Sequence, residues 1–123
     1  MIVLDYQDRR PIYEQVTDKF QILILNGVLP PGSQMPSVRQ LATELSVNPN
    51  TIQRAYMELE KLGLIYPVKG KGNFVAETQQ IQEKSKEDFR KEFLELVRRG
   101  INTGMTEEEL MTLVQKGYEE EQR

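Results

Sequence analysis

The sequence predicts a mainly α-helical protein in which residues 1–76 form three helices and a β-hairpin, and residues 77–123 form two more helices. Three observations predict this. The stretch 35–64 shows helical spacing of apolar residues twice, with a turn signal between. A glycine-rich turn then separates two short apolar runs within 64–76, and no proline occurs after residue 76. A chain of 123 residues is long enough for one small domain with an appendage.

The first expected helix begins at Pro11 and ends at Asn26-Gly27, because proline suits a first turn and glycine suits the position after a helix. Ile22 and Leu25 fall outside its apolar stripe, so we expect this helix to contact a second surface as well. The stripe at core spacing consists of Ile12, Val16, Phe20, Leu23 and Ile24.

Two short helices are expected next. Ser37 and Gln40 have the spacing of a capping box at the start of the first. The second begins at Asn48-Pro49, an N-cap residue followed by proline at the first helical position, and it ends at Gly63. Their buried faces are expected to be Val38, Leu41, Ala42 and Leu45 in the first helix, and Ile52, Ala55, Tyr56, Leu59 and Leu62 in the second.

The opposite face of the second short helix is polar in its N-terminal half. Asn50 and Arg54 lie on it with Thr51 and Gln53 on the flanks, and no acidic residue occurs between Leu45 and Met57. Amide and guanidinium groups can bond bidentately to adenine and guanine edges, and a helix N-terminus attracts phosphate. Such a face is also compatible with simple solvation. The pair of helices is typical of a helix-turn-helix.

The segment after these helices predicts a β-hairpin. Its turn is Lys69-Gly70-Lys71-Gly72-Asn73, and Pro67 restricts the first strand to a sheet edge or an irregular position. The turn lacks the spacing and the Ser or Thr of a phosphate-binding loop. Placed after a helix-turn-helix, it is typical of the wing of a winged helix, with two lysines directed at DNA phosphates or the minor groove.

The sequence resembles the bacterial GntR-type transcription regulators over roughly residues 10–76. The resemblance is carried by PSVRQLATELSVNPNTIQRAYMELEKLGLI followed by GKGNFV, and upstream by PIYEQV and GVLPPGSQMPS. Met35 stands where leucine is usual, Pro49 replaces a polar or basic residue, and Gln53 falls where some members place a base-reading arginine. The resemblance implies a winged helix-turn-helix that binds double-stranded DNA, but it does not give the operator sequence.

The resemblance also implies which residues bind DNA. In the family, the arginine of the first motif helix, the polar residues that open the recognition helix and the wing glycine meet DNA. Carried over, these are Arg39, Asn48, Asn50, Thr51, Gln53, Arg54 and Gly70. Ser37 at the helix start and Lys69, Lys71 and Gly72 in the wing complete the expected set.

Charge and composition narrow the function further. The formal net charge is -3, but residues 1–76 carry eight Lys and Arg against seven Asp and Glu, whereas residues 77–123 carry eight against twelve. The acidity therefore belongs to the C-terminal region, and we expect a local basic face formed by Arg39, Arg54, Lys69 and Lys71. The sequence has no cysteine and no histidine, so we expect no disulfide, no metal site of the usual kinds and no cofactor.

The C-terminal region predicts a long helix from about residue 79 to 99, ended by Arg98-Arg99-Gly100, and a last helix opened by a capping box of Thr106 and Glu109. Two such helices cannot enclose a core, so they either pack back onto the first domain or pair with a second copy. The expected dimerisation residues are Phe89, Phe93, Leu96, Val97, Leu110, Leu113 and Val114.

A dimer is the favoured reading, because helix-turn-helix proteins generally place two recognition helices one DNA turn apart. A short two-helix extension also resembles the YtrA-type branch of the GntR family, which implies a dimeric repressor of a transporter-linked operon. We therefore expect a winged helix-turn-helix DNA-binding domain at 1–76, a helical dimerisation region at 77–123, and a palindromic operator as the partner.

Two other functions are compatible with parts of the sequence. A protein-interaction module without a specific DNA target is the alternative, since the acidic runs at 107–109 and 119–121 could engage a basic partner. An enzyme is not expected: pairs such as Glu92 and Glu95 have the spacing of an exposed helix face, with nothing apolar to raise a pKa. An unknown small-molecule effector could bind an apolar pocket between the long helix and the DNA-binding domain, near Phe89, Phe93 and Met111.

The N-terminal segment MIVLD is too short for a signal sequence and is followed by Asp5 and Asp8. We therefore expect a cytoplasmic protein without a membrane partner. Residues 1–5 could also form a short strand that pairs with the wing hairpin.

Overall fold

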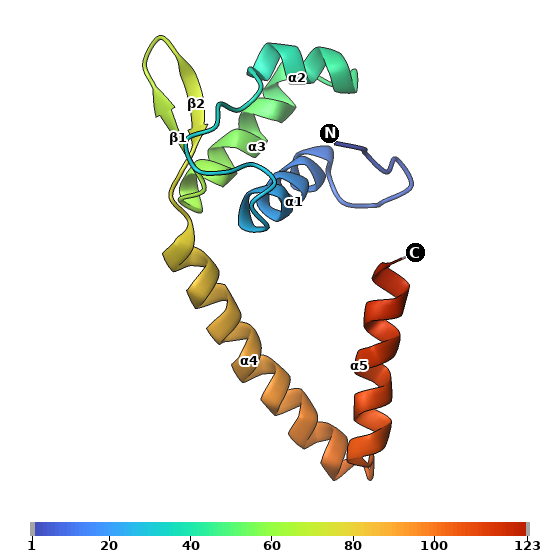
Figure 1. Ribbon diagram of the computed structural model, residues 1–123. Coiled ribbons are helices and arrows are strands. Elements are labelled where there is room, and N and C mark those ends of the chain that lie inside the picture. The colour runs from blue at the N-terminus through green and yellow to red at the C-terminus, as the bar shows by residue number, and fades with distance from the viewer. Residues whose placement is uncertain (1, 123) are drawn as a thin grey trace. The chain divides into compact units, whose positions relative to one another are not determined.

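The computed structural model describes residues 2–122, which form helices and one two-stranded antiparallel sheet (Figure 1). The elements are α1 (Ile12–Leu25), α2 (Val38–Leu45), α3 (Pro49–Lys61), β1 (Ile65–Val68), β2 (Gly72–Val75), α4 (Gln79–Asn102) and α5 (Glu107–Glu121). The expected fold class is confirmed: three helices and a hairpin, followed by two C-terminal helices. The chain divides into two compact units between Gln82 and Glu83, inside α4.

The core of the first unit lies between α1 and α3. Phe20 of α1 is fully buried against Tyr56 of α3, with ring centroids 5.9 Å apart in an edge-to-face arrangement. Such a pair adds about 0.5–1.5 kcal/mol to the effect of burial alone. The expected apolar stripe of α1 supplies Val16, Phe20 and Ile24, whereas Ile22 remains 54% exposed as its place outside the stripe predicts.

The helix ends form where the local sequence places them. The Asn48 side chain accepts a hydrogen bond from the Asn50 N–H at 2.8 Å, and Pro49 occupies the first position of α3. Gly63 follows α3 with φ +77°, a value that favours glycine. Ser37 accepts from the Gln40 N–H at 3.0 Å, and within the described residues only this half of the expected capping box forms.

The wing is a hairpin held on its second strand by a third segment. β1 and β2 pair antiparallel, with Ile65 opposite Val75 and Val68 opposite Gly72. On the other side of β2, residues 32–35 form three backbone hydrogen bonds of 2.8 Å: Gly32 N–H to Val75 O, Val75 N–H to Ser33 O, and Met35 N–H to Asn73 O. β1 is therefore the edge strand, which is where Pro67 was expected.

The expected strand at residues 1–5 is wrong for the part that the structure describes, since residues 2–5 are not in a strand. Ile2 instead joins the hydrophobic core. The Gln15 side chain accepts from the Asp5 N–H at 3.0 Å and donates to the Arg10 carbonyl at 3.2 Å. The hydrogen bond from the Asp5 N–H anchors this segment to α1.

The first turn of α4 belongs to the first unit. Thr78, just before it, is buried, and Ile81 packs against the core. The Gln82 side-chain amide donates to the Leu25 carbonyl near the end of α1. The beginning of the long helix is thereby fixed to the winged helix-turn-helix.

The second unit consists of the rest of α4 and α5, which diverge from a turn at residues 103–106 (Figure 1). The expected end of the long helix at Gly100 is wrong, because α4 continues to Asn102. Gly100 is buried under Leu110: a Cβ at this position would lie 3.2 Å from a Leu110 methyl group. The glycine permits close packing here, and Gly104 with φ +88° provides the turn.

The capping box at the start of α5 is confirmed in full. The Thr106 hydroxyl accepts from the Glu109 N–H at 3.1 Å, and the Glu109 carboxylate accepts from the Thr106 N–H at 3.2 Å. This fixes the start of α5 immediately after the turn.

A buried hydroxyl connects the core to the start of α2. Tyr56 donates a hydrogen bond to the Pro36 carbonyl at 2.7 Å, and burial raises the pKa of the Tyr56 phenol. The phenol therefore remains a neutral donor at physiological pH, and it secures the segment that leads into the helix-turn-helix.

Tyr56→Phe should lower the free energy of unfolding by about 1–2 kcal/mol, because the Pro36 carbonyl loses its partner while the ring packing is retained. Urea unfolding at a fixed protomer concentration measures this. Tyr66→Phe, at an exposed ring of β1, is the control and should be near neutral. Equal stability of the Tyr56→Phe and Tyr66→Phe proteins would contradict the role of this hydrogen bond.

Candidate nucleic-acid interface

The turn between α2 and α3 presents the second helix to solvent. Ser46 adopts a left-handed conformation with φ 56°, and the Val47 N–H donates to the Ala42 carbonyl at 3.0 Å. The chain thereby reverses within three residues, from Ser46 to Asn48, and α3 begins. α2 and α3 then pack through Leu41 and Ala42 on one side and Ile52 and Ala55 on the other, all of them buried. The expected helix-turn-helix is present.

The expected DNA-binding residues of α3 lie on its solvent face. Asn48, Asn50, Gln53 and Arg54 are exposed, and Thr51 is half-buried. The opposite face of the helix is buried, as the periodicity predicts, through Ile52, Ala55, Tyr56 and Leu59. The expected burial of Leu62 is wrong, because this residue follows the end of α3 and is 48% exposed. The N-terminal half of α3 is therefore a free polar surface on a rigid helix.

Two further expected residues flank this surface on α2. Ser37 is the N-cap of α2, and Arg39 is exposed in its first turn. The Thr43 hydroxyl bonds the Arg39 carbonyl at 3.0 Å, one helical turn further along. The Arg39 guanidinium remains free, because it forms no ion pair within residues 2–122.

The wing carries the other four expected residues at its tip. Lys69, Gly70, Lys71 and Gly72 are all exposed. Gly70 has φ +78° and Gly72 has φ +110°, so glycine is needed at both positions of the turn. The Lys71 N–H donates to the Val68 carbonyl at 2.9 Å and closes the hairpin.

The ion pairs of the first unit leave the basic residues of this surface available. Arg10 is occupied, since it pairs with both Asp8 and Asp18, and its hydrogen bonds hold the pKa of the Asp8 carboxyl below its usual value. Lys61, at the far end of α3, pairs with Glu58 at 3.7 Å. By contrast, Arg39, Arg54, Lys69 and Lys71 are in no ion pair within the described part of the chain. These four cations are free to meet an anion.

The structure identifies two residues that contact the expected DNA-binding residues and that the sequence did not indicate. Gln34 donates from its side-chain amide to the Lys71 carbonyl at 2.8 Å, which attaches the wing tip to the segment before α2. The ring of Tyr13 lies under Arg54, with the guanidinium carbon 3.8 Å from the ring centroid. Both contacts join residues 37 or more positions apart, so helical periodicity and turn motifs could not reveal them. Tyr13 belongs to the PIYEQV motif, but the motif indicated only the family resemblance and no role for this side chain.

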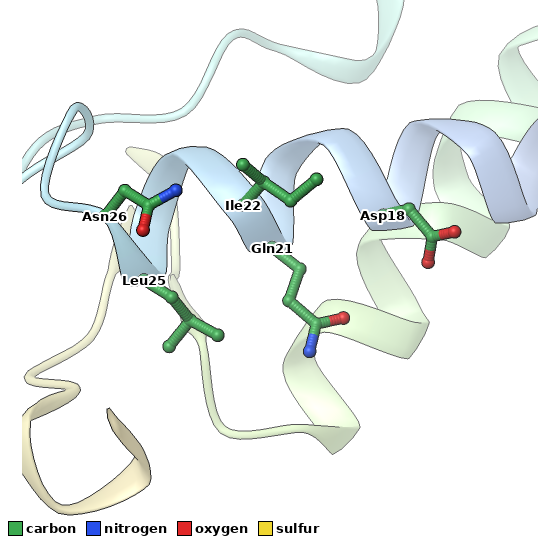
Figure 2. Close-up of a pocket in the computed structure, with 5 residues that line it drawn as sticks. All are labelled: Asp18, Gln21, Ile22, Leu25 and Asn26. Carbon is green, nitrogen blue, oxygen red and sulfur yellow. The ribbon is translucent and has the colours of Figure 1, made fainter. Parts of the chain in front are cut away.

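A separate shallow hollow of about 310 Å³ lies along α1, lined by Asp18, Gln21, Ile22, Leu25 and Asn26 (Figure 2). Figure 2 shows these side chains from the middle of α1, at Asp18, to the residue that follows the helix, Asn26. It contains both of the apolar residues that fall outside the α1 stripe. That Ile22 and Leu25 contact a second surface stays a prediction, although Leu25 also packs against the core of the first unit.

The expected dimerisation residues come together in the second unit. Six of them line a hollow of about 260 Å³ between α4 and α5, and Phe89 stacks on Phe93 with centroids 5.9 Å apart. Leu96 and Leu113 are 55% and 52% exposed, so the surface is apolar and uncovered. The six are Phe93, Leu96, Val97, Leu110, Leu113 and Val114.

Within residues 2–122 the structure forms no group of three or more acidic side chains that could hold a metal ion. None of the helices it describes combines the length and the apolar content that crossing a bilayer requires. An apolar hollow does form at Phe93 and Met111, but it lies between α4 and α5.

The winged helix-turn-helix matches a known protein family. Residues 12–75 match the family model described as bacterial regulatory proteins, gntR family. The chain belongs to the GntR family. This confirms the resemblance read from the sequence motifs, and the matched residues run from the start of α1 to the end of β2.

Curated relatives extend this result along the chain. The chain is 39% identical over 107 residues to the HTH-type transcriptional regulator YhcF of Bacillus subtilis, covering 86% of this chain and 88% of that protein. It is 44% identical over 77 residues to the HTH-type transcriptional repressor YtrA of the same organism, covering 63% of this chain and 59% of YtrA. This GntR protein is therefore a DNA-binding transcription regulator with a winged helix-turn-helix.

Solved structures agree with both the fold and the ligand class. A GntR family transcriptional regulator from Listeria monocytogenes is 37% identical and covers 92% of this chain and 98% of its own, with a TM-score of 0.71. The DNA-binding domain of AraR, solved in complex with operator ORR3, is 32% identical and covers 62% of this chain and 92% of its own, with a TM-score of 0.53. The AraR structure shows that a domain of this kind binds operator DNA.

Gln34→Ala should loosen the wing tip without unfolding the domain, because it removes the side-chain bond to the Lys71 carbonyl but leaves the backbone bonds of residues 32–35. We expect lower NMR order parameters at Gly70 and Lys71, and a loss of stability below about 1 kcal/mol. Gln80→Ala, at an exposed glutamine, is the matched control. Unchanged order parameters at both wing residues would show that Gln34 does not hold the tip.

Proposed function

We propose that this GntR regulator is a homodimeric repressor that binds a palindromic operator, and that the operator belongs to a transporter-linked operon. The observation that carries the proposal is the free, exposed polar and basic face formed by α3, Arg39 and the wing. This face carries four cations that form no ion pair within residues 2–122, and such a face has the chemistry needed to bind a polyanion.

In this proposal the residues have two kinds of role. Base edges and phosphates are approached by the exposed side chains of the helix-turn-helix: Arg39, Asn50, Thr51, Gln53 and Arg54. Asn48, Lys69, Gly70 and Lys71 position the DNA backbone, with Ser37 and Gly72 beside them. The operator complex of the AraR domain supports this arrangement, because that domain is similar in sequence and fold to the first unit.

Arg39→Ala should weaken operator binding on the order of 100-fold, because each half-site loses one charged contact worth about 1–3 kcal/mol. A gel shift with the DNA upstream of the protein's own gene, with competitor DNA and at physiological salt, measures this. Lys19→Ala, on α1 near Asp8, removes the same charge elsewhere and should have little effect. Wild-type affinity of the Arg39→Ala protein would remove Arg39 from the interface.

Dimerisation is supported by the exposed apolar surface of the second unit. Five large apolar side chains of α4 and α5 are each more than half exposed, and a stable monomer rarely exposes so much apolar surface: Phe89, Leu96, Met111, Leu113 and Tyr118. A second copy of the chain, related by twofold symmetry, would cover the same surface on both copies. It would also place two winged helix-turn-helix domains on one DNA duplex. Residues 1–76 would then serve as the DNA-binding region and 77–123 as the dimerisation region.

Leu113→Glu should weaken dimerisation at least about 100-fold, since each leucine loses about 1.5–3 kcal/mol of burial and the dimer contains two. Gln115→Glu introduces the same charge at a nearby exposed position of α5 and is the control. Analytical ultracentrifugation over a concentration series gives the two dissociation constants. A Leu113→Glu protein that stays dimeric as tightly as the Gln115→Glu protein would place the interface elsewhere.

Repression and the transporter link rest on similarity. YtrA, to which the chain is 44% identical, is named a transcriptional repressor. Such a regulator would act on DNA in the cytoplasm, with no membrane partner.

A reporter gene fused to the bound promoter should gain expression when the gene for this regulator is deleted. Reduced expression of the reporter would instead show that the regulator is an activator. A small-molecule effector of this regulator would bind the apolar hollow of about 320 Å³ between α4 and α5, whose lining includes Phe93 and Met111.

A further inference from the structure

The exposed side chain of Arg54 lies on an aromatic ring. Its guanidinium carbon is 3.8 Å from the centroid of the Tyr13 ring, well inside the range of about 6 Å for a cation–π contact. A stacked guanidinium keeps the N–H donors at its edges available, because only one of its faces is covered. Arg54 forms no ion pair in the described residues, so these donors have no competing carboxylate.

The ring beneath Arg54 is itself held in place. Tyr13 is half-buried and packs against the hydrophobic core, and its hydroxyl lies 3.3 Å from a Glu14 carboxylate oxygen. The Thr17 hydroxyl lies 2.8 Å from the Tyr13 carbonyl and 3.5 Å from the carbonyl of Ala55, the residue after Arg54. The start of α1 and the middle of α3 are thus fixed relative to each other beneath the stack.

The stack borders a hollow that faces the candidate DNA surface. The hollow has a volume of about 390 Å³ and contains no acidic side chain in its lining. Three of its residues belong to the expected DNA-binding set of α3, and the other three come from the start of α1. The lining residues are Pro11, Ile12, Tyr13, Asn50, Thr51 and Arg54.

We propose that Tyr13 is a positioning residue for DNA recognition: its ring holds the Arg54 guanidinium in one orientation before DNA arrives. This inference rests on the proposed function of α3 as the DNA-reading helix. An arginine side chain carries considerable rotamer freedom, which must be lost when it binds. A side chain that is already stacked loses less, so its contact with DNA is stronger and more selective for geometry.

A purely structural role of Tyr13 in the core is the competing explanation, and two substitutions separate the roles. Tyr13→Phe keeps the ring and its stacking. Tyr13→Leu keeps an apolar side chain against the core but removes the π face. A role in positioning Arg54 requires that these two variants differ in DNA binding while both remain folded.

The experiment measures affinity for the DNA upstream of the protein's own gene, and for a scrambled duplex of equal length, by fluorescence anisotropy at fixed salt. We expect Tyr13→Phe to bind within about twofold of wild type. Tyr13→Leu should bind the upstream DNA about 5- to 30-fold more weakly, from one exposed cation–π contact per half-site in a dimer. Binding to the scrambled duplex should change less, so the specificity ratio falls.

A double-mutant cycle with Arg54→Met identifies the residue through which Tyr13 acts. If Tyr13 acts through Arg54, adding Tyr13→Leu to Arg54→Met causes no further loss, although each single variant binds more weakly than wild type. Fully additive losses, or equal binding by Tyr13→Leu and Tyr13→Phe, would overturn the proposal.

Two controls keep the result interpretable. Urea unfolding of Tyr13→Leu and Tyr13→Phe shows whether both are folded, and a ring-current shift of the Arg54 guanidinium protons in the free protein reports the stack directly. We expect this shift in wild type and Tyr13→Phe but not in Tyr13→Leu; its absence from wild type would overturn the proposal. Wild-type protein that binds the upstream and scrambled DNA equally would contradict the proposed function itself, whereas specific wild-type binding with unaffected Tyr13 variants would contradict only the role of Tyr13.

Discussion

The packing of α1 against α3 is the interaction on which the first unit depends. Phe20 and Tyr56 meet at its centre, and the Tyr56 hydroxyl extends the contact to the carbonyl of Pro36 just before α2. One buried pair therefore fixes three elements. Because an amphipathic helix buries one face, seating α3 through Tyr56 and Leu59 turns the opposite face, with Asn50 and Arg54, to solvent. Packing of the core therefore decides which face of α3 is exposed.

The wing depends on the same frame through the segment before α2. Residues 32–35 bond to β2, and they continue directly into the Tyr56-bound Pro36 and the Ser37 cap. A two-stranded hairpin alone is only marginally stable in water, so this third segment and the Gln34 contact at the tip matter for its position. The helix-turn-helix and the wing are thus placed by one continuous run of chain.

The second unit follows a different principle. Gly100 and Leu110 close the turn between α4 and α5, and the capping box of Thr106 fixes where α5 begins. Little else in this unit is buried, and its large apolar side chains remain at the surface. The first turn of α4 is attached to the winged helix through Ile81 and Gln82. The second unit is therefore joined to the winged helix-turn-helix through one helix, α4.

The sequence by itself determined the elements and the class of site. Apolar spacing, the Asn48-Pro49 start, Gly63 and the glycine turn at 70–72 are local signals, and each placed its element correctly because helix ends and tight turns depend on nearby residues. Local signals did not predict features that depend on contacts between residues far apart in the sequence. Gly100 lies within α4 and against Leu110, and Ile2 joins the core on a segment whose Asp5 N–H bonds to Gln15. The stack of Arg54 on Tyr13 and the bond from Gln34 to Lys71 join positions far apart in the chain, so only the tertiary structure could bring them together.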